Sequence, residues 1–238
     1  MSPIVLALDT SGASASVALL QGSVLIQEVL IHRGVHHSES LLPAIETLCR
    51  DTGLSMEAVE LLACTAGPGS FTGLRIGMST VKGFALASGR PVAAVSTLEA
   101  LARGVGPSPF PVCPLLDARK GQIYGAVYRY GSDSVMECTG HERLSHIASF
   151  LEETITPALF VGDGALAYRE QIVAKKGGAC LFADPLQAHV RAAIVGRIGY
   201  ERFLAGETET ALSLTPRYLR LSEAETALAG SLSCETDV

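Results

Sequence analysis

The residues best suited to chemistry form a glycine-rich turn, Gly67-Pro68-Gly69-Ser70-Phe71-Thr72-Gly73. The turn lies between an apolar run, Leu61–Ala66, typical of a short buried strand, and a helical pattern over Leu74–Ser88. Backbone N–H groups point outward at a helix N-terminus, so such a turn can bind an anion. The sequence lacks the lysine of a Walker A loop, the G-x-G-x-x-G spacing and the G-x-S-x-G turn. These absences favour the alternative, a tight strand-to-helix connection without a ligand.

Histidines and cysteines are the other side chains that could bind a metal or react. His32, His36 and His37 are clustered, and we interpret them as solvent-exposed residues beside a helix N-terminus rather than as ligands. The six cysteines include no C-x-x-C pair, and three of them, Cys49, Cys64 and Cys113, lie in apolar runs. This usage indicates a reducing compartment rather than a disulfide scaffold.

Composition narrows the classes of partner. Charged residues make up 18% of the chain, less than the usual quarter or so, which leaves room for an apolar surface or for a large buried core. The formal net charge of −6, without a basic run, predicts that any role with nucleic acid is indirect. The apolar run Ile4–Leu8 is too short for a signal peptide, and no stretch has the 18 or so apolar residues of a membrane span, so the cytoplasm is expected.

The elements that would position the glycine turn begin with three strands, predicted at Ile4–Leu8, Ser16–Leu20 and Val24–Ile31. A helix follows over Ser38–Arg50, with Ser38 as its N-cap and Gly53 beyond its end. Its apolar residues recur at helical spacing. They are Leu41, Leu42, Ile45 and Leu48.

Three glycines, Gly73, Gly77 and Gly83, belong to the helix after the turn. Glycine inside a helix costs up to about 1 kcal/mol relative to alanine, so their presence indicates that another backbone approaches closely. That backbone belongs either to the same chain or to another chain. The helix is followed by a predicted strand at Val92–Val95 and a short helix at Thr97–Ala102.

The pattern restarts after a stretch rich in glycine and proline, 104–111. Strands are predicted at Leu115–Asp117, Tyr124–Tyr128 and Val135–Cys138, and a long helix from Pro185 or Leu186 to Ala205. Each half begins with an apolar strand that ends in aspartate, which indicates an internal duplication. We predict a first lobe over 1–103, a smaller second lobe over 104–221 whose long helix packs back on the first, and an acidic, partly disordered tail over 222–238.

Five motifs, in this order, resemble the TsaB (YeaZ) family and cover the chain to about Arg220. They are Ile4-Val5-Leu6-Ala7-Leu8-Asp9-Thr10-Ser11, His37-Ser38-Glu39-Ser40-Leu41-Leu42-Pro43, Gly67-Pro68-Gly69-Ser70-Phe71-Thr72-Gly73-Leu74-Arg75-Ile76-Gly77, Val161-Gly162-Asp163-Gly164 and Pro216-Arg217-Tyr218-Leu219-Arg220. The resemblance implies an α/β fold of two duplicated ribonuclease H-like (βββαβα) lobes, as in the actin/Hsp70/sugar-kinase (ASKHA) superfamily. It also implies a cytoplasmic, non-catalytic scaffold for adding a threonylcarbamoyl group to the adenosine beside the tRNA anticodon.

The partners implied by the resemblance are TsaD, the catalytic paralogue, in a heterodimer, and TsaE in a ternary complex. The resemblance also implies that the chain forms a homodimer when it is alone. It implies that the chain contacts tRNA only through the complex and does not bind a membrane. The two helices described above would form the interface with TsaD. The residues expected to bind it are Leu41, Leu42, Ile45, Leu48, Gly73, Leu74, Gly77, Met78 and Val81.

The resemblance also bears on metal and nucleotide. TsaD binds metal through H-x-E-x-H, and the matching segment here has Thr97 and Leu101 at the histidine positions, leaving Glu99. Because leucine has no donor atom and one carboxylate makes a weak site, we predict no metal. No cofactor is expected, with ATP or ADP plus magnesium as the alternative. Its candidate contacts are Asp9, Thr10, Ser11, Gly162, Asp163 and Gly164.

The nucleotide alternative is weakened by Asp117-Ala118-Arg119-Lys120-Gly121, which has bulky residues where a second phosphate loop needs glycines. Two alternative functions are an ATP-binding enzyme of the sugar-kinase type and a glycoprotease-like peptidase. The missing histidine pair disfavours a metallopeptidase.

Overall fold

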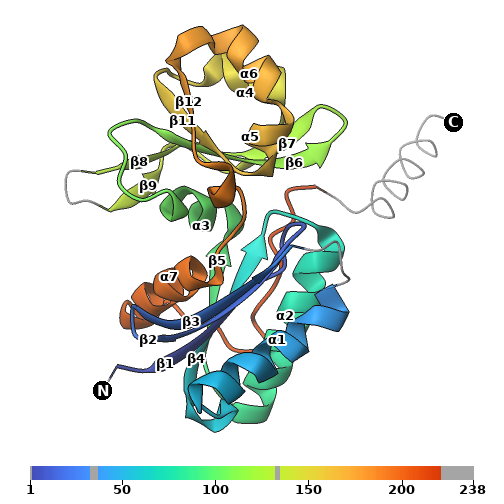
Figure 1. Ribbon diagram of the computed structural model, residues 1–238, viewed down its shortest axis with the longest axis vertical. Coiled ribbons are helices and arrows are strands. Elements are labelled where there is room, and N and C mark those ends of the chain that lie inside the picture. The colour runs from blue at the N-terminus through green and yellow to red at the C-terminus, as the bar shows by residue number, and fades with distance from the viewer. Residues whose placement is uncertain (1, 33–36, 132–134, 221–238) are drawn as a thin grey trace, which may run out of the picture.

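The computed structural model describes residues 2–32, 37–131 and 135–220, so His36 and the predicted acidic tail lie outside the described residues. Two α/β lobes lie one above the other along the long axis of the molecule (Figure 1). Each lobe is built on a mixed sheet, as the predicted duplication requires, and the fold is that of two ribonuclease H-like lobes.

The first lobe has a five-stranded sheet in the order β3-β2-β1-β4-β5. Its central strands, β1 and β4, are parallel, and they are apolar except at Asp9, Glu60 and Thr65 because helices cover both faces of the sheet. Strand β1 is antiparallel to β2, which forms the predicted hairpin with β3. The strand bounds are β1 (Ile4–Asp9), β2 (Ala15–Gln21), β3 (Val24–Ile31), β4 (Val59–Gly67) and β5 (Val92–Ser96).

Helices α1 (His37–Thr52) and α2 (Phe71–Ser88) cover one face of this sheet, with a short 3-10 turn, η1 (Met56–Ala58), before β4. Helix α1 already includes His37, so the prediction of Ser38 as its N-cap was wrong. Helix α2 begins three residues earlier than predicted because the Ser70 hydroxyl caps it by accepting from the Gly73 amide. Gly89, with φ of 68°, ends it.

The other face of the first sheet is covered by α3 (Thr97–Gly104) and by α7 (Ala192–Leu204), which comes from the far end of the chain. A Cβ on Gly196 would lie 2.4 Å from Leu20 Cδ1, and one on Gly199 would lie 2.7 Å from Ala63 Cβ. These glycines therefore let α7 lie close against the sheet, beside β2 and β3 in Figure 1.

The sheet of the second lobe repeats the arrangement in the order β10-β7-β6-β11-β12, with β8 paired to β6 and β9. Its strands are β6 (Val112–Arg119), β7 (Gln122–Gly125), β8 (Tyr128–Tyr130), β9 (Met136–Cys138), β10 (Arg143–His146), β11 (Ala158–Val161) and β12 (Cys180–Phe182). Its helices are α4 (Ile147–Glu153), α5 (Asp163–Ala167) and α6 (Arg169–Lys176), with 3-10 turns η2 (Gly177–Ala179) and η3 (Pro185–Gln187).

Three predictions for the second lobe need correction. The predicted second strand is divided into β7 and β8. The third strand is also divided: β9, at the predicted position, pairs with β8. The other part, β10, pairs with β7. Helix α7 begins at Ala192, well after the predicted start, because Asp184 caps a separate turn at Pro185–Gln187.

Over the part of the chain that the structure describes, no helix is long and apolar enough to span a membrane.

Candidate functional site

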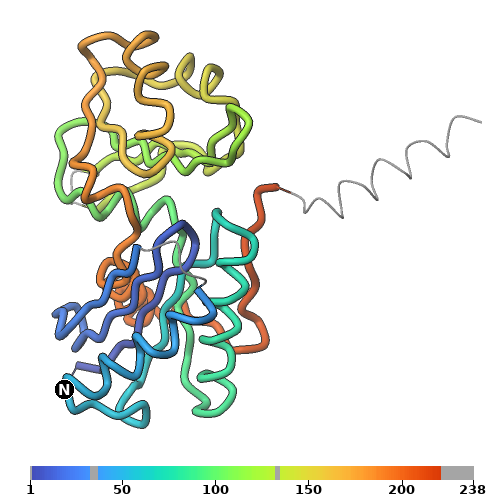
Figure 2. Tube along the Cα trace, turned by 45° about the vertical axis from the view of Figure 1, so that its right-hand side comes forward, coloured from blue at the N-terminus to red at the C-terminus, as the bar shows by residue number. Residues whose placement is uncertain are grey.

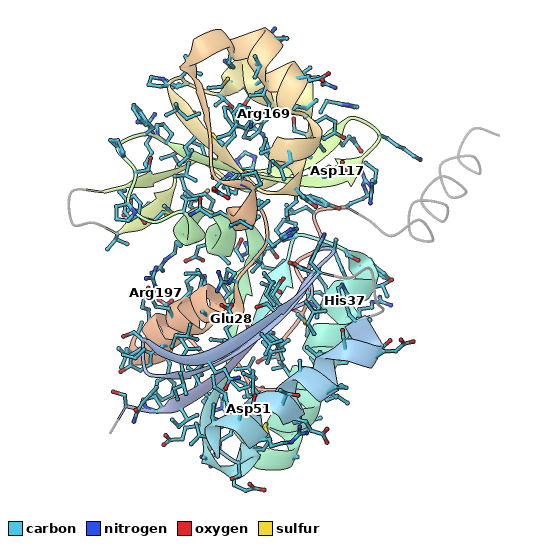
Figure 3. All side chains as sticks on the ribbon, viewed as in Figure 1. Glu28, His37, Asp51, Asp117, Arg169 and Arg197 are labelled. Atoms are coloured by element: carbon cyan, nitrogen blue, oxygen red, sulfur yellow. The ribbon has the colours of Figure 1, made fainter. Side chains whose placement is uncertain are left out.

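A cleft of about 720 Å³ lies between the two lobes. The first lobe contributes the β1–β2 loop and the N-terminal end of α2, and the second contributes the β6–β7 turn and the start of α5. Residues 217–220 line it as well. They end the segment after α7, which Figure 2 shows running beside α2. Figure 3 labels Asp117 on the side of the second lobe that faces the first.

Asp9 ends β1 beside this cleft, and its carboxylate is fully buried. Its Oδ1 accepts hydrogen bonds from the Ser11 amide (3.1 Å), the Ser11 hydroxyl (2.6 Å) and the Thr65 hydroxyl (2.6 Å). Its Oδ2 has no hydrogen-bond partner among the described residues. Burial raises the pKa of Asp9, and these hydrogen bonds oppose the rise.

The next two residues, Thr10 and Ser11, hold the start of α2 in place, and Ser11 also lines the cleft. The Thr10 hydroxyl donates to the Gly73 carbonyl at 2.7 Å, and the Ser70 amide donates to the Ser11 carbonyl at 2.7 Å. A Cβ on Gly73 would lie 2.0 Å from Thr10 O, and one on Gly69 would lie 2.4 Å from Ser11 O. The glycine-rich turn is therefore a close connection that seats α2 on the end of β1, as the alternative reading of the sequence proposed.

Of the three candidate nucleotide contacts in the second lobe, Asp163 lines the cleft and the two glycines do not. Gly162 and Gly164 pack against the backbone of Leu115, where an added Cβ would lie within 3 Å of its atoms. Asp163 does line the cleft; its Oδ1 accepts from the Asp117 amide at 3.1 Å, and burial raises its pKa. Of the six candidates, Ser11 and Asp163 line the cleft, and Asp9, Thr10, Gly162 and Gly164 are not part of its lining.

Arginines and aromatic rings at the cleft were not assigned a role from sequence. Phe71 and Tyr218 are each 37% exposed, with ring centroids 5.0 Å apart. The Arg75 guanidinium lies 3.8 Å from the Phe71 centroid, and its Nε donates to the Tyr218 hydroxyl at 3.1 Å. Arg217 and Tyr218 belong to the last of the five family motifs, Pro216-Arg217-Tyr218-Leu219-Arg220. Two arginines close to a tyrosine in that motif are the sequence signal that indicates a binding role for these residues.

Glu99, which remains from the H-x-E-x-H pattern, is held by arginines. Its Oε2 accepts from Arg202 Nη2 of α7 at 2.6 Å, and its Oε1 lies 3.6 Å from Arg103 Nη1. Thr97 and Leu101 are buried. Across the described residues, no group of three or more His, Cys, Asp or Glu side chains is placed to hold a metal ion.

The outward surface of α1 and α2 is the second candidate site. Most residues expected to bind a partner are buried within the first lobe itself, so the part of the two helices that a partner can reach is made of other residues. Those buried are Leu41, Ile45, Leu48, Gly73, Leu74, Gly77, Met78 and Val81. Leu42 is exposed (53%), and the same two helices expose Pro43, Ser79, Gly83 and Leu86. Space around Gly83 is open, whereas a Cβ on Gly77 would lie 2.4 Å from Thr10 Oγ1.

Comparison with known proteins shows which family the sequence resembles. A family model described as TsaD, tRNA N6-adenosine threonylcarbamoyltransferase, matches residues 32–228. The tRNA threonylcarbamoyladenosine biosynthesis protein TsaB of Bacillus subtilis is 31% identical over 93% of this chain and 96% of its own length. TsaB of Escherichia coli is 35% identical over 55% of this chain and 57% of its own length.

Solved structures are also similar. YeaZ from Pseudomonas aeruginosa superposes with a TM-score of 0.77 at 29% identity, covering 92% of this chain and all of that one. Component A of (R)-2-hydroxyglutaryl-CoA dehydratase from Acidaminococcus fermentans gives a TM-score of 0.52 at 11% identity, covering 84% of this chain and 99% of that one. The second likeness concerns the fold alone.

Proposed function

The chain belongs to the TsaB (YeaZ) family and takes part in threonylcarbamoyladenosine biosynthesis in tRNA, and we propose that it does so as a non-catalytic scaffold that pairs with TsaD. The observation that carries this proposal is the outward surface of α1 and α2, which exposes apolar side chains. On the opposite face of the same sheet, α3 has Thr97 and Leu101 where the metal-binding pattern needs histidines.

The proposal that the chain is not itself the transferase rests on the surroundings of Glu99. Its carboxylate forms ion pairs with Arg202 and Arg103, and the positions two residues to either side are filled by buried Thr97 and Leu101. A metal would have to displace both arginines and would gain one carboxylate. Zinc or iron binding at one equivalent, abolished by Glu99→Ala, would contradict the proposal.

The proposed contact with TsaD is the outward surface of α1 and α2, where Leu42, Pro43, Gly83 and Leu86 are exposed. An exposed glycine with open space around it lets a partner helix come close, and the leucines supply apolar area. A stable pair would bury roughly the 1,600 Å² of a standard interface. We further propose that the surface pairs two copies when TsaD is absent, and that TsaE joins the TsaD-bound form.

Light scattering after size-exclusion chromatography tests this surface, with the chain alone and then mixed with TsaD. We expect a homodimer that exchanges into a heterodimer. Gly83→Trp should block both associations and leave the monomer folded, because nothing lies within 4 Å of the added Cβ. Gly178→Trp, at an equally open site on the second lobe, is the matched control and should pair normally. Unimpaired pairing of Gly83→Trp would count against this surface.

The alternative of an ATP-binding enzyme of the sugar-kinase type has one supporting observation, the buried Oδ2 of Asp9 without a partner among the described residues. The packing of Thr10, Gly162 and Gly164 against the backbone weighs against it. Isothermal titration with ATP and magnesium separates the two functions, and we expect no saturable heat. The peptidase alternative has no comparable support. A tRNA-modifying role also supports the proposed cytoplasmic location.

A further inference from the structure

The β6–β7 turn carries two cations in an unfavourable backbone conformation. Arg119 and Lys120 have φ of 67° and 55°, and Gly121 follows at 73°. A turn with successive positive φ values favours asparagine and glycine, because a Cβ crowds the backbone there. Both side chains are exposed, and that of Arg119 is 85% exposed. Two cations at positions that suit asparagine and glycine point to a use for their charge.

Further cations reach the same edge of the cleft from the other lobe and from the end of the described chain. Arg220 Nη1 donates to the Ala118 carbonyl at 3.0 Å, at the base of the β6–β7 turn, and its Nη2 also donates to Gln122. Arg217 lines the cleft and is exposed. Among residues 2–32, 37–131 and 135–220, no carboxylate forms an ion pair with Arg75, Lys120, Arg217 or Arg220.

Aromatic faces lie among these cations. Phe71 and Tyr218 form a tilted pair at the cleft, and Arg75 lies over Phe71. We call Phe71, Arg75, Lys120, Arg217, Tyr218 and Arg220 the basic rim. Of the two acids that line the cleft, Asp117 forms an ion pair with Arg119 at 3.5 Å and not with a cation of the basic rim. Asp117 accepts from the Tyr168 hydroxyl and the Arg119 amide, and Asp163 accepts from the Asp117 amide.

We propose that the basic rim binds single-stranded RNA directly, through the anticodon loop of the tRNA that is modified. Unpaired cations can contact successive phosphates, and exposed aromatic rings can stack on unpaired bases, which is how proteins bind single-stranded nucleic acid. The chain has a net charge of −6, so the rim is a local exception to its acidic surface. This inference rests on the proposed function and adds to it a contact with the tRNA by this chain itself.

The test measures fluorescence anisotropy of a labelled anticodon stem-loop RNA with the full chain, over about 50 to 200 mM salt. Lys120→Glu with Arg217→Glu should weaken binding at least tenfold at low salt and reduce the salt slope by roughly 1.4, since each phosphate contact to a single strand contributes about 0.7. The control pair Arg50→Glu with Lys175→Glu changes the net charge equally at exposed sites outside the cleft. It should bind like the wild type.

A second comparison separates stacking from charge. Tyr218→Ala should weaken binding about tenfold without changing the salt slope, and Tyr218→Phe should restore it, because a base stacks on the ring and not on the hydroxyl. A duplex made from the stem alone should bind less tightly than the stem-loop.

Several results would overturn the inference. They are no binding by the wild type, equal losses in the rim and control pairs, equal affinity for the duplex, or preferential binding of a peptide with the acidic sequence of residues 221–238. Light scattering with TsaD on the same variants keeps the two proposals apart. A wild-type chain that pairs with TsaD but does not bind the RNA removes this inference alone, whereas a wild-type chain that binds the RNA but does not pair removes the scaffold.

Discussion

The carboxylate of Asp9 shows how strongly a single buried group can couple stability to pH. Burial raises its pKa, so between the unfolded and folded pKa values the folded chain binds more protons than the unfolded chain. The contribution of Asp9 to the free energy of unfolding therefore falls as pH rises from about 4 through the raised pKa. Above that pKa a charged carboxylate with one unpartnered oxygen is buried.

Asp9→Asn should reduce this pH dependence. The asparagine oxygen can still accept from Ser11 and Thr65, and the amide has no charge to bury. Urea unfolding at about pH 4 and about pH 8 should show the variant gaining stability relative to wild type at the higher pH. Glu170→Gln, at an exposed position on α6, is the control for a lost carboxylate. A wild-type to Asp9→Asn difference that is constant with pH would contradict the role given to burial.

Two glycines on α2 should respond to alanine in opposite directions. Gly73→Ala brings a Cβ to 2.0 Å from a backbone oxygen and should lower the free energy of unfolding by about 1–3 kcal/mol. Gly83→Ala meets nothing within 4 Å and should raise it by about 0.5–1 kcal/mol through helix propensity. Thermal unfolding of both variants measures the contrast, and similar shifts would contradict it.

Residue patterns were informative about packing and less so about sites. The spacing of Leu41, Ile45 and Leu48 predicted a helix, which the structure confirms, and these residues, expected to bind a partner, are buried in it. The same spacing could not tell whether that face is covered by the chain's own sheet or by a partner, since both bury apolar area. The aromatic and arginine rim was not predicted, because Arg75 and Tyr218 meet only after folding.

Elements with continuous apolar runs were predicted well, and their ends less so. β1, β2, β4 and β5 are confirmed because a strand covered on one or both faces has a clear pattern. β10 was missed because Arg143–His146 is short and polar. The start of α7 was misplaced because Pro185 suits the first turn of a helix and also begins a separate turn.

Helix α7 should be critical for the first lobe although it follows the second in sequence. Ile198 is 1% exposed on the first sheet, so Ile198→Ala should cost about 2–5 kcal/mol in the free energy of unfolding. Leu204, on the same helix, is 67% exposed, and Leu204→Ala should stay within about 0.5 kcal/mol of wild type. Denaturant unfolding followed by circular dichroism compares them, and equal losses would contradict the assigned packing.

At the scale of the whole molecule, two sets of contacts fix the lobes relative to each other. On one side, Glu142 accepts from the Tyr128 hydroxyl at 2.7 Å and from Ser96 at the end of β5. On the other, residues 217–220 connect the first lobe, where the Arg217 amide donates to the Ala66 carbonyl at 2.7 Å, to the second through Arg220. The predicted lobe boundary near residue 104 stays a prediction.

A chain that stops after Thr215 should therefore loosen the β6–β7 turn without unfolding. Losing Arg220 removes two hydrogen bonds to that turn, while the Glu142 contacts remain. Hydrogen exchange of residues 117–123 should become several-fold faster, with little change in melting temperature. A chain that stops after Arg220 is the control and should exchange like the wild type. Equal rates in both shortened chains would show that the segment does not restrain the turn.

The position of α7 also affects the order in which the protein can fold during translation. The ribosome completes the first sheet with β5 at Ser96 but does not reach Ala192, where the covering helix begins, until it has made the whole second lobe. At ordinary elongation rates this interval lasts roughly 5–20 s. Throughout it the nascent chain carries a sheet with one apolar face covered only in part, by α3, and an apolar surface left open in this way is the kind that chaperones bind.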